Sequence, residues 1–123
     1  LIANDVGAWV AKYNPQVVAF DPWAAGNIAN RLTRVAAVAP MSGGYFAQAC
    51  DVMLSAMTAK RIAHANQPEL TDAINACAKK AAADGGWRVV RRASAIPISA
   101  AIAAIMVVWY ANQPQQDVGI IAV

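Results

Sequence analysis

One carboxylate of the sequence stands where a divalent cation could bind. Asp21 ends the run Gln-Val-Val-Ala-Phe-Asp and is followed at once by Pro22. A continuous apolar run is typical of a strand covered on both faces of a parallel sheet, and ligand sites of α/β proteins lie beyond the carboxyl ends of such strands. Carboxylates at that position commonly hold Mg²⁺ or Mn²⁺. The structural alternative is that Asp21 only caps the helix that follows.

A second feature with chemical meaning is a cluster of cations near the carboxyl end of the chain. Its members are Lys79, Lys80, Arg88, Arg91 and Arg92, and the whole chain has a net charge of +3. Such clustering favours a polyanionic partner, nucleic acid above all. A solvated surface hairpin is the alternative, because clusters of this size are common on protein surfaces.

Several other chemistries are excluded by the residue types that are present. His64 is the only histidine, so a histidine-rich metal cluster or a Ser-His-Asp arrangement has only one imidazole to draw on, and a structural role for it is expected. Glycine-rich phosphate loops and the HExxH pattern are absent from the sequence. Cys50 and Cys77 fall in predicted helices without CxxC or CxxH spacing, which indicates buried, reduced thiols.

The elements that would position Asp21 form a β-α-β unit. A strand is predicted over 16–21, a helix over 23–32 and a second buried strand over 35–39, before Pro40. Parallel pairing of two strands needs a crossover helix of this kind. The sequence therefore predicts an α/β fold with a short parallel core.

Helical spacing elsewhere predicts long covering helices. They are expected over 3–13, over 42–63 with Ser42 as the cap, over 71–82 and over 94–111. Asp84-Gly85-Gly86 is turn chemistry, which makes the run over 87–92 one arm of a small hairpin. The run over 100–109 is almost wholly apolar, but it is shorter than the roughly 20 residues of a membrane span, which favours a buried core helix.

The bulk composition is unusually apolar for a chain of this size. Hydrophobic residues make up 59% and charged residues 14% of 123 residues, against about 45–50% and 25% in ordinary domains. The length fits one domain, and so large an apolar fraction predicts a partner. The chain opens at Leu1 without a signal-peptide pattern, so we expect a fragment of a longer protein.

The order of these segments resembles the C-terminal nuclease region of the phage terminase large subunit, the motor that packages and cuts viral DNA, particularly in actinobacterial phages and prophages. The segments that carry the resemblance read YNPQVVAFDPW, MSGGYFAQACDVMLSAMTAKRIAHANQPELTDAINACAKK and WRVVRRASAIPISAAIAAIMVVWYA. The resemblance covers most of the chain. It implies a partial RNase H-like nuclease domain over residues 1–112 and a C-terminal tail over 113–123.

The resemblance also implies a metal-dependent endonuclease in the intact parent protein. Acidic residues of such a site bind two Mg²⁺ or Mn²⁺ ions for phosphodiester cleavage, and Asp21 would be a catalytic residue and metal ligand. The family's first acidic residue lies on an earlier strand that is not represented here, and its last one would fall on Pro97 or Ser99, neither of which is an anionic ligand. We therefore expect little or no nuclease activity from this chain alone.

The partners implied by the resemblance are double-stranded DNA and proteins of the packaging machinery. DNA would contact the cationic cluster, and the protein partners would be further copies of the chain or other terminase and portal subunits, in the cytoplasm of the host cell during virion assembly and without a membrane. An unpaired edge of the strand over 16–21 would favour self-association by strand exchange. The competing hypothesis is a non-catalytic, prophage-derived oligomerisation or docking module whose helix over 98–110 is buried against another subunit.

Overall fold

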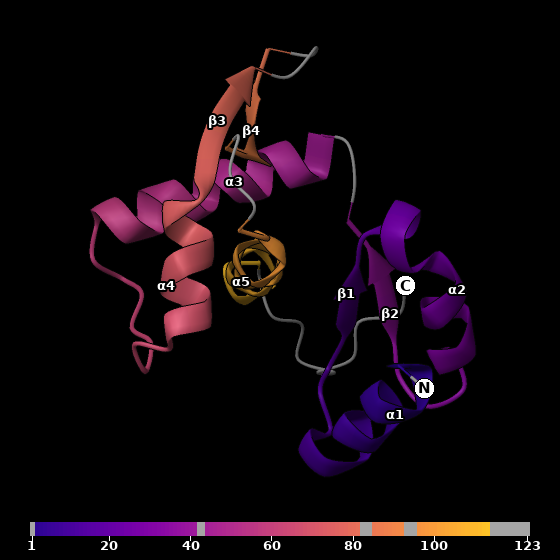
Figure 1. Ribbon diagram of the computed structural model, residues 1–123. Helices are drawn as coiled ribbons and strands as arrows, with labels where there is room; N and C mark the ends of the chain where they lie inside the picture. Colours follow the sequence, from indigo (N-terminus) through magenta and orange to yellow (C-terminus); the bar gives the residue numbers. More distant parts are fainter. Residues whose placement is uncertain (1, 42–43, 82–84, 93–95, 114–123) are drawn as a thin grey trace. The chain divides into compact units, whose positions relative to one another are not determined.

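The computed structural model describes residues 2–41, 44–81, 85–92 and 96–113. Contacts divide the chain into two compact units, one up to residue 42 and the other over residues 43–113. The elements of both are labelled in Figure 1. The expectations for the Ser42 cap, for the turn residue Asp84 and for the tail from residue 114 onward concern residues outside the described part of the chain.

The first unit is a parallel β-α-β arrangement preceded by a helix. Its elements are α1 (Ile2–Tyr13), β1 (Val18–Phe20), α2 (Pro22–Leu32) and β2 (Val38–Pro40). The strands pair in parallel, with Ala19 beside Ala39, and α2 packs against α1 and against both strands. The predicted β-α-β unit is confirmed. Parallel strands need a crossover connection, and α2 provides it between β1 and β2.

The second unit is built around three helices. They are α3 (Gly44–Thr58), α4 (Pro68–Asn75) and α5 (Ser99–Ala111), and α5 packs against both of the others. The side chains buried on α3 and α5 are Ala49, Cys50, Met53, Ala56, Ala101, Ile105 and Met106. The prediction of a buried core helix near the carboxyl end is therefore confirmed. Among the described residues, no helix has the length and apolar character needed to cross a membrane.

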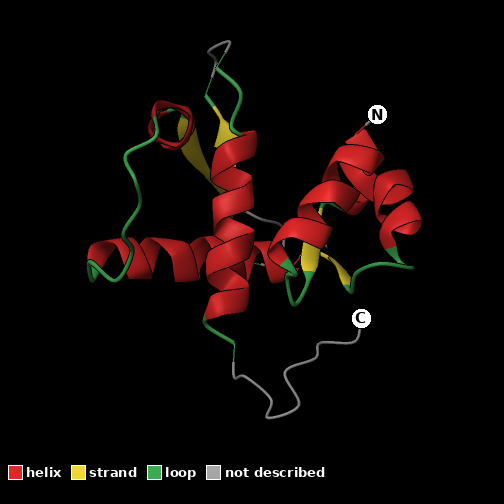
Figure 2. Cartoon of the chain, turned by 90° about the horizontal axis from the view of Figure 1, so that it is seen from below, coloured by secondary structure: helices red, strands yellow, loops and turns green. Residues whose placement is uncertain are grey.

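A small antiparallel hairpin completes the second unit. It consists of β3 (Cys77–Ala81) and β4 (Trp87–Arg91), and β4 packs on α3. The strand predicted over 87–92 is confirmed, but the helix predicted over 71–82 is wrong beyond Asn75. The Ala-Lys sequence of β3 favours a helix by local propensity. Pairing with β4 supplies a full antiparallel ladder, and this tertiary contact outweighs the local preference. Figure 2 shows both short sheets among the helices.

The helix predicted over 42–63 ends at Thr58 because the chain reverses there. Lys60 has a φ of 57°, in the left-handed region that commonly ends helices. The N–H of Lys60 donates to the C=O of Met57, and the N–H of Arg61 donates to the C=O of Ala56 at 2.9 Å. This pair of hydrogen bonds is the Schellman motif. The motif usually has glycine where this chain has Lys60, so the sequence did not indicate it.

The two cysteines are free thiols in the second unit. Cys50 is buried on α3, whereas Cys77 is half-buried at the start of β3 and its thiol donates to the C=O of Ala73 at 3.3 Å. Burial raises the pKa of both thiols above the ordinary value of 9.0. The helical setting predicted for Cys77 is wrong, but the prediction of reduced thiols agrees with the structure, and protonated thiols of this kind are poor nucleophiles.

Truncation of the α5 core should destabilise the protein strongly. Ile105 is 2% exposed, so Ile105→Ala is expected to lower the free energy of unfolding by about 2–5 kcal/mol, through lost burial and the cavity left behind. Urea unfolding followed by circular dichroism measures the loss. Val107 on the same helix is 67% exposed, and Val107→Ala should cost less than about 0.5 kcal/mol. Equal losses would contradict the orientation of α5.

The protein should lose stability as the pH rises above about 9. The pKa of both thiols is raised above 9.0 in the folded state, so the unfolded chain releases these protons first. Their contribution is complete below that pH and is lost as the pH passes through the folded-state pKa. Urea midpoints between pH 7 and about 10 test this. The double variant Cys50→Ala/Cys77→Ala should show a flatter curve, and an unchanged slope would contradict thiol burial as the cause.

Candidate functional site

Asp21 lies beyond the carboxyl ends of both strands of the parallel sheet. It directly follows β1, and the last residue of that strand, Phe20, accepts a hydrogen bond from the N–H of Met41 just after β2, at 2.8 Å. Asp21 also directly precedes α2, whose residue Ala25 donates its N–H to the Asp21 C=O at 2.8 Å. The carboxylate therefore occupies a strand end and a helix start at once, so its position suits both roles considered from the sequence.

A complete metal centre is not present among the residues that the structure describes. No three histidine, cysteine, aspartate or glutamate side chains gather there in a way that could hold a metal ion. Asp21 is half-buried, but one carboxylate does not supply the ligands of a two-metal site, which requires several oxygen donors around each ion. The described residues thus do not fit a full nuclease centre.

Pro97 or Ser99 would take the position at which the family resemblance places another acidic ligand. Ser99 is the first residue of α5, where Ile98 precedes it without a side-chain capping hydrogen bond, and Ser99 and Pro97 are both exposed. A hydroxyl is not an anionic metal ligand. Ser99 belongs to the second unit and Asp21 to the first.

The five predicted cationic residues lie together on or beside the hairpin of β3 and β4. We call this element the basic hairpin, defined by Lys79, Lys80, Arg88, Arg91 and Arg92. All five side chains are exposed, and the antiparallel register places Lys80 directly opposite Arg88. Separate runs of the sequence are thereby joined into one positively charged hairpin.

Two members of the basic hairpin also have contacts within the chain. The Nε of Arg92 donates to the C=O of Cys77 at 2.9 Å. This hydrogen bond links the two strands at the end of the hairpin opposite the turn. The Nζ of Lys79 lies 4.3 Å from the centre of the Trp87 ring, a cation–π contact. These two cations therefore contribute to the structure of the hairpin as well as to its charge.

His64 lies in the loop between α3 and α4 and is exposed. Its Nδ1 accepts a hydrogen bond from the N–H of Asn66 at 3.0 Å, and Asn66 has a φ of 60°. The imidazole therefore holds a left-handed turn. No described residue joins it in a catalytic arrangement or a metal cluster.

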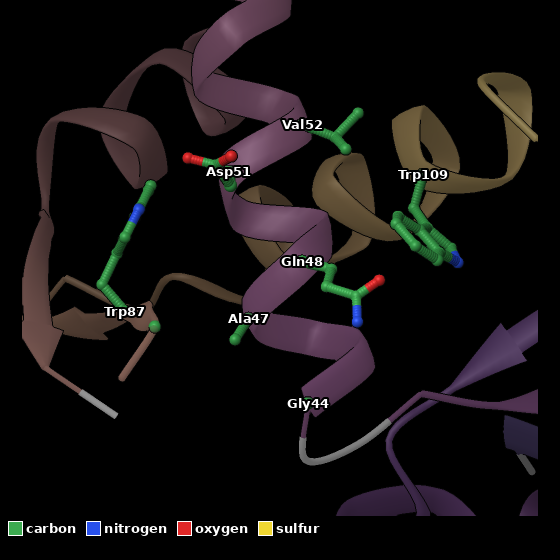
Figure 3. Close-up of a pocket in the computed structure, with 8 residues that line it drawn as sticks. Gly44, Ala47, Gln48, Asp51, Val52, Trp87 and Trp109 are labelled. Carbon is green, nitrogen blue, oxygen red and sulfur yellow. The ribbon is translucent and has the colours of Figure 1, made fainter. Parts of the chain in front are cut away.

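An open pocket in the second unit was not predicted. It has a volume of about 550 Å³ and lies along the first half of α3, between the start of β4 and the end of α5. Figure 3 shows Trp87 and Trp109 on either side of α3, with Gln48 and Asp51 projecting from the helix. Gln48 and Asp51 are both exposed on α3. The pocket depends on three elements that are distant in sequence, so periodicity alone carried no signal for it.

Comparison with known proteins agrees with this arrangement of elements. A family model described as "Terminase large subunit, endonuclease domain" matches residues 2–115. Among solved structures, the large terminase of bacteriophage HK97 is similar, with a TM-score of 0.70 and 18% sequence identity, over 89% of this chain. The match covers 24% of that terminase, so the chain spans about a quarter of its length. The comparison with curated proteins returned no match.

The likeness in structure confirms the predicted fold class, an α/β, partial RNase H-like fold with a short parallel β-α-β core, covering helices and a small hairpin. The family model extends over both units, from α1 to the end of α5. By this match, the chain belongs to the family of terminase large-subunit endonuclease domains.

Proposed function

We propose that the chain is a fragment of a viral DNA-packaging terminase nuclease and that it contacts double-stranded DNA through the basic hairpin. The observation that carries this proposal is the hairpin itself. Its five cations are exposed and gather on one short element. Membership of the terminase endonuclease family makes the phosphate backbone of DNA the expected polyanion. The intact protein would act with other packaging subunits in the cytoplasm of the host cell.

Asp21 is proposed as one metal ligand, and hence a catalytic residue, of the nuclease centre in the intact parent. Its place beyond the carboxyl ends of β1 and β2 supports this role. Mg²⁺ or Mn²⁺ fits a carboxylate donor. The chain alone is expected to have little or no nuclease activity, because the described residues do not bring three metal-ligating side chains together.

A second candidate, a non-catalytic oligomerisation module derived from a prophage protein, is favoured by the free edge of β1. Val18 and Phe20 make their backbone hydrogen bonds toward β2, through Ala37 and Met41. Because successive residues of a strand point their backbone groups to opposite sides, the N–H and C=O of Ala19 face the other edge. No described strand pairs there. A second copy could add its own β1 at this edge.

The helix α5, which covers most of the segment over 98–110, packs within its own unit. The buried side chains of α5, such as Ile105 and Met106, pack within the second unit against α3 and α4. Only scattered apolar residues of α5 are well exposed, Val107 above all. The oligomerisation candidate therefore rests on the strand edge of the first unit rather than on α5.

Duplex DNA should bind with an affinity that falls steeply with salt. Each phosphate neutralised by a lysine or arginine contributes about 0.9 to the slope of log K against log salt. A fluorescently labelled duplex titrated with the protein between about 50 and 200 mM salt measures the slope by anisotropy. A total slope of at least about 2 is expected from the basic hairpin. Binding that does not respond to salt would contradict a phosphate contact.

Metal titration should separate the two candidates. Mn²⁺ is expected to broaden the amide signals of Phe20 and Met41, which flank Asp21 at the sheet end, and the broadening should vanish in Asp21→Asn. Asp5→Asn removes an exposed carboxylate of α1 and should leave it intact. The oligomerisation module would be supported instead if Mn²⁺ had no effect and sedimentation showed a dimer. Ala19→Pro should then dissociate that dimer. Metal-dependent cleavage of DNA by this chain would contradict the expected inactivity.

A further inference from the structure

The register of the basic hairpin singles out two of its five cations. Lys80 on β3 lies directly opposite Arg88 on β4. The N–H of Arg92 donates to the C=O of Ala76 at 2.9 Å, and hydrogen-bonded pairs alternate along an antiparallel ladder, so the Lys80–Arg88 pair is also a hydrogen-bonded one. Residues paired in this way have Cα atoms about 5.5 Å apart, and their side chains leave the same face of the hairpin.

The other three cations are placed differently. Lys79 lies over the ring of Trp87, and Arg91 is opposite Cys77 on the face that Lys79 shares. Arg92 donates through its Nε to the backbone of Cys77. Lys80 and Arg88 have neither an aromatic nor a carbonyl partner of this kind among the described residues, and both are exposed.

We infer that Lys80 and Arg88 form a clamp for one phosphate-type anion, and that the free protein tolerates a destabilising repulsion to keep it. This inference rests on the proposed contact with DNA and names the residues that make it. Like charges directly opposite each other in a sheet are destabilising. An anion between the two side chains replaces the repulsion with two attractive, charge-assisted contacts, and the fork of the arginine suits phosphate oxygens.

Protection of the sheet edge is the simpler explanation, because exposed edge strands often carry lysine. It explains a cation on each strand of a two-stranded hairpin. It does not explain why the two cations face each other. A shift of either cation by one residue along its strand would place the two on opposite faces and remove the repulsion. The neighbouring pair on the same face, Ala78 and Val90, is uncharged, so it provides no compensating carboxylate.

The first test is the salt dependence of duplex DNA binding by the full chain. Lys80→Gln/Arg88→Gln should lower the slope of log K against log salt by about 1, the contribution of one phosphate. The matched control is Arg31→Gln/Arg34→Gln, which removes the same charge from exposed positions of the first unit and should leave the slope nearly unchanged. An unchanged slope in the clamp variant, or an equal loss in the control, would overturn the inference while leaving DNA binding itself established.

The second test uses inorganic phosphate and thermal unfolding. Lys80→Glu turns the repulsive pair into an attractive one, so it should raise the melting temperature of the free protein by roughly 1–5 °C. Phosphate should raise the melting temperature of the wild-type protein and have no such effect on Lys80→Glu. If DNA fails to bind but this phosphate effect is seen, the clamp stands and the proposed function falls. If Lys80→Glu neither stabilises the protein nor abolishes the phosphate effect, the clamp is overturned.

Discussion

The close packing of α5 against α3 and α4 is the interaction on which the second unit depends. Small side chains make it possible, because Ala49 and Ala101 are fully buried and let the helix backbones approach, while Ile105 and Met106 fill the remaining space. No polar or charged side chain is buried in the described part of the chain, so the core has no polar groups that must be satisfied. The core of the unit is thus built from alanines and a few larger apolar residues, while Tyr45, Leu54 and Val107 of the same unit stay exposed.

The hairpin takes its position from this core. β4 rests on α3, and the two half-buried valines of that strand, Val89 and Val90, anchor it while the arginines on either side remain in solvent. A two-stranded hairpin alone is marginally stable in water. The helices beneath it therefore allow a short sheet to carry several like charges, a density that an isolated hairpin would not tolerate.

Much of the fold could be read from the sequence, and the errors have identifiable causes. Continuous apolar runs bounded by prolines indicated β1 and β2, and the uninterrupted apolar run indicated α5, because these patterns reflect burial directly. β3 was missed because Cys-Ala-Lys-Lys-Ala has helical propensity, and only its pairing with β4 across the turn makes it a strand. The end of α3 was misplaced because Lys60 takes a backbone conformation more usual for glycine.

The same distinction between local signals and tertiary contacts applies to the candidate site. Asp21 could be located at a strand end because the run before it and Pro22 after it are local signals. That Lys80 faces Arg88 follows only from the register of the hairpin. That Trp87 and Trp109 border one pocket follows only from packing between separate segments. Residue types therefore indicated which side chains to consider, whereas strand pairing and packing set which of them lie together.

The two edges of the small parallel sheet differ in how well they can pair with a further strand. Pro40 ends that strand and has no N–H to donate, and it falls on the side away from β1, since Ala39 is among the residues that bond inward. A further strand that paired with β2 would therefore lack one backbone hydrogen bond, whereas Ala19 offers both of its backbone groups at the edge of β1. If identical copies joined edge to edge through β1, the contact would be two-fold, and the missing donor at Pro40 would disfavour its extension into an open-ended fibre.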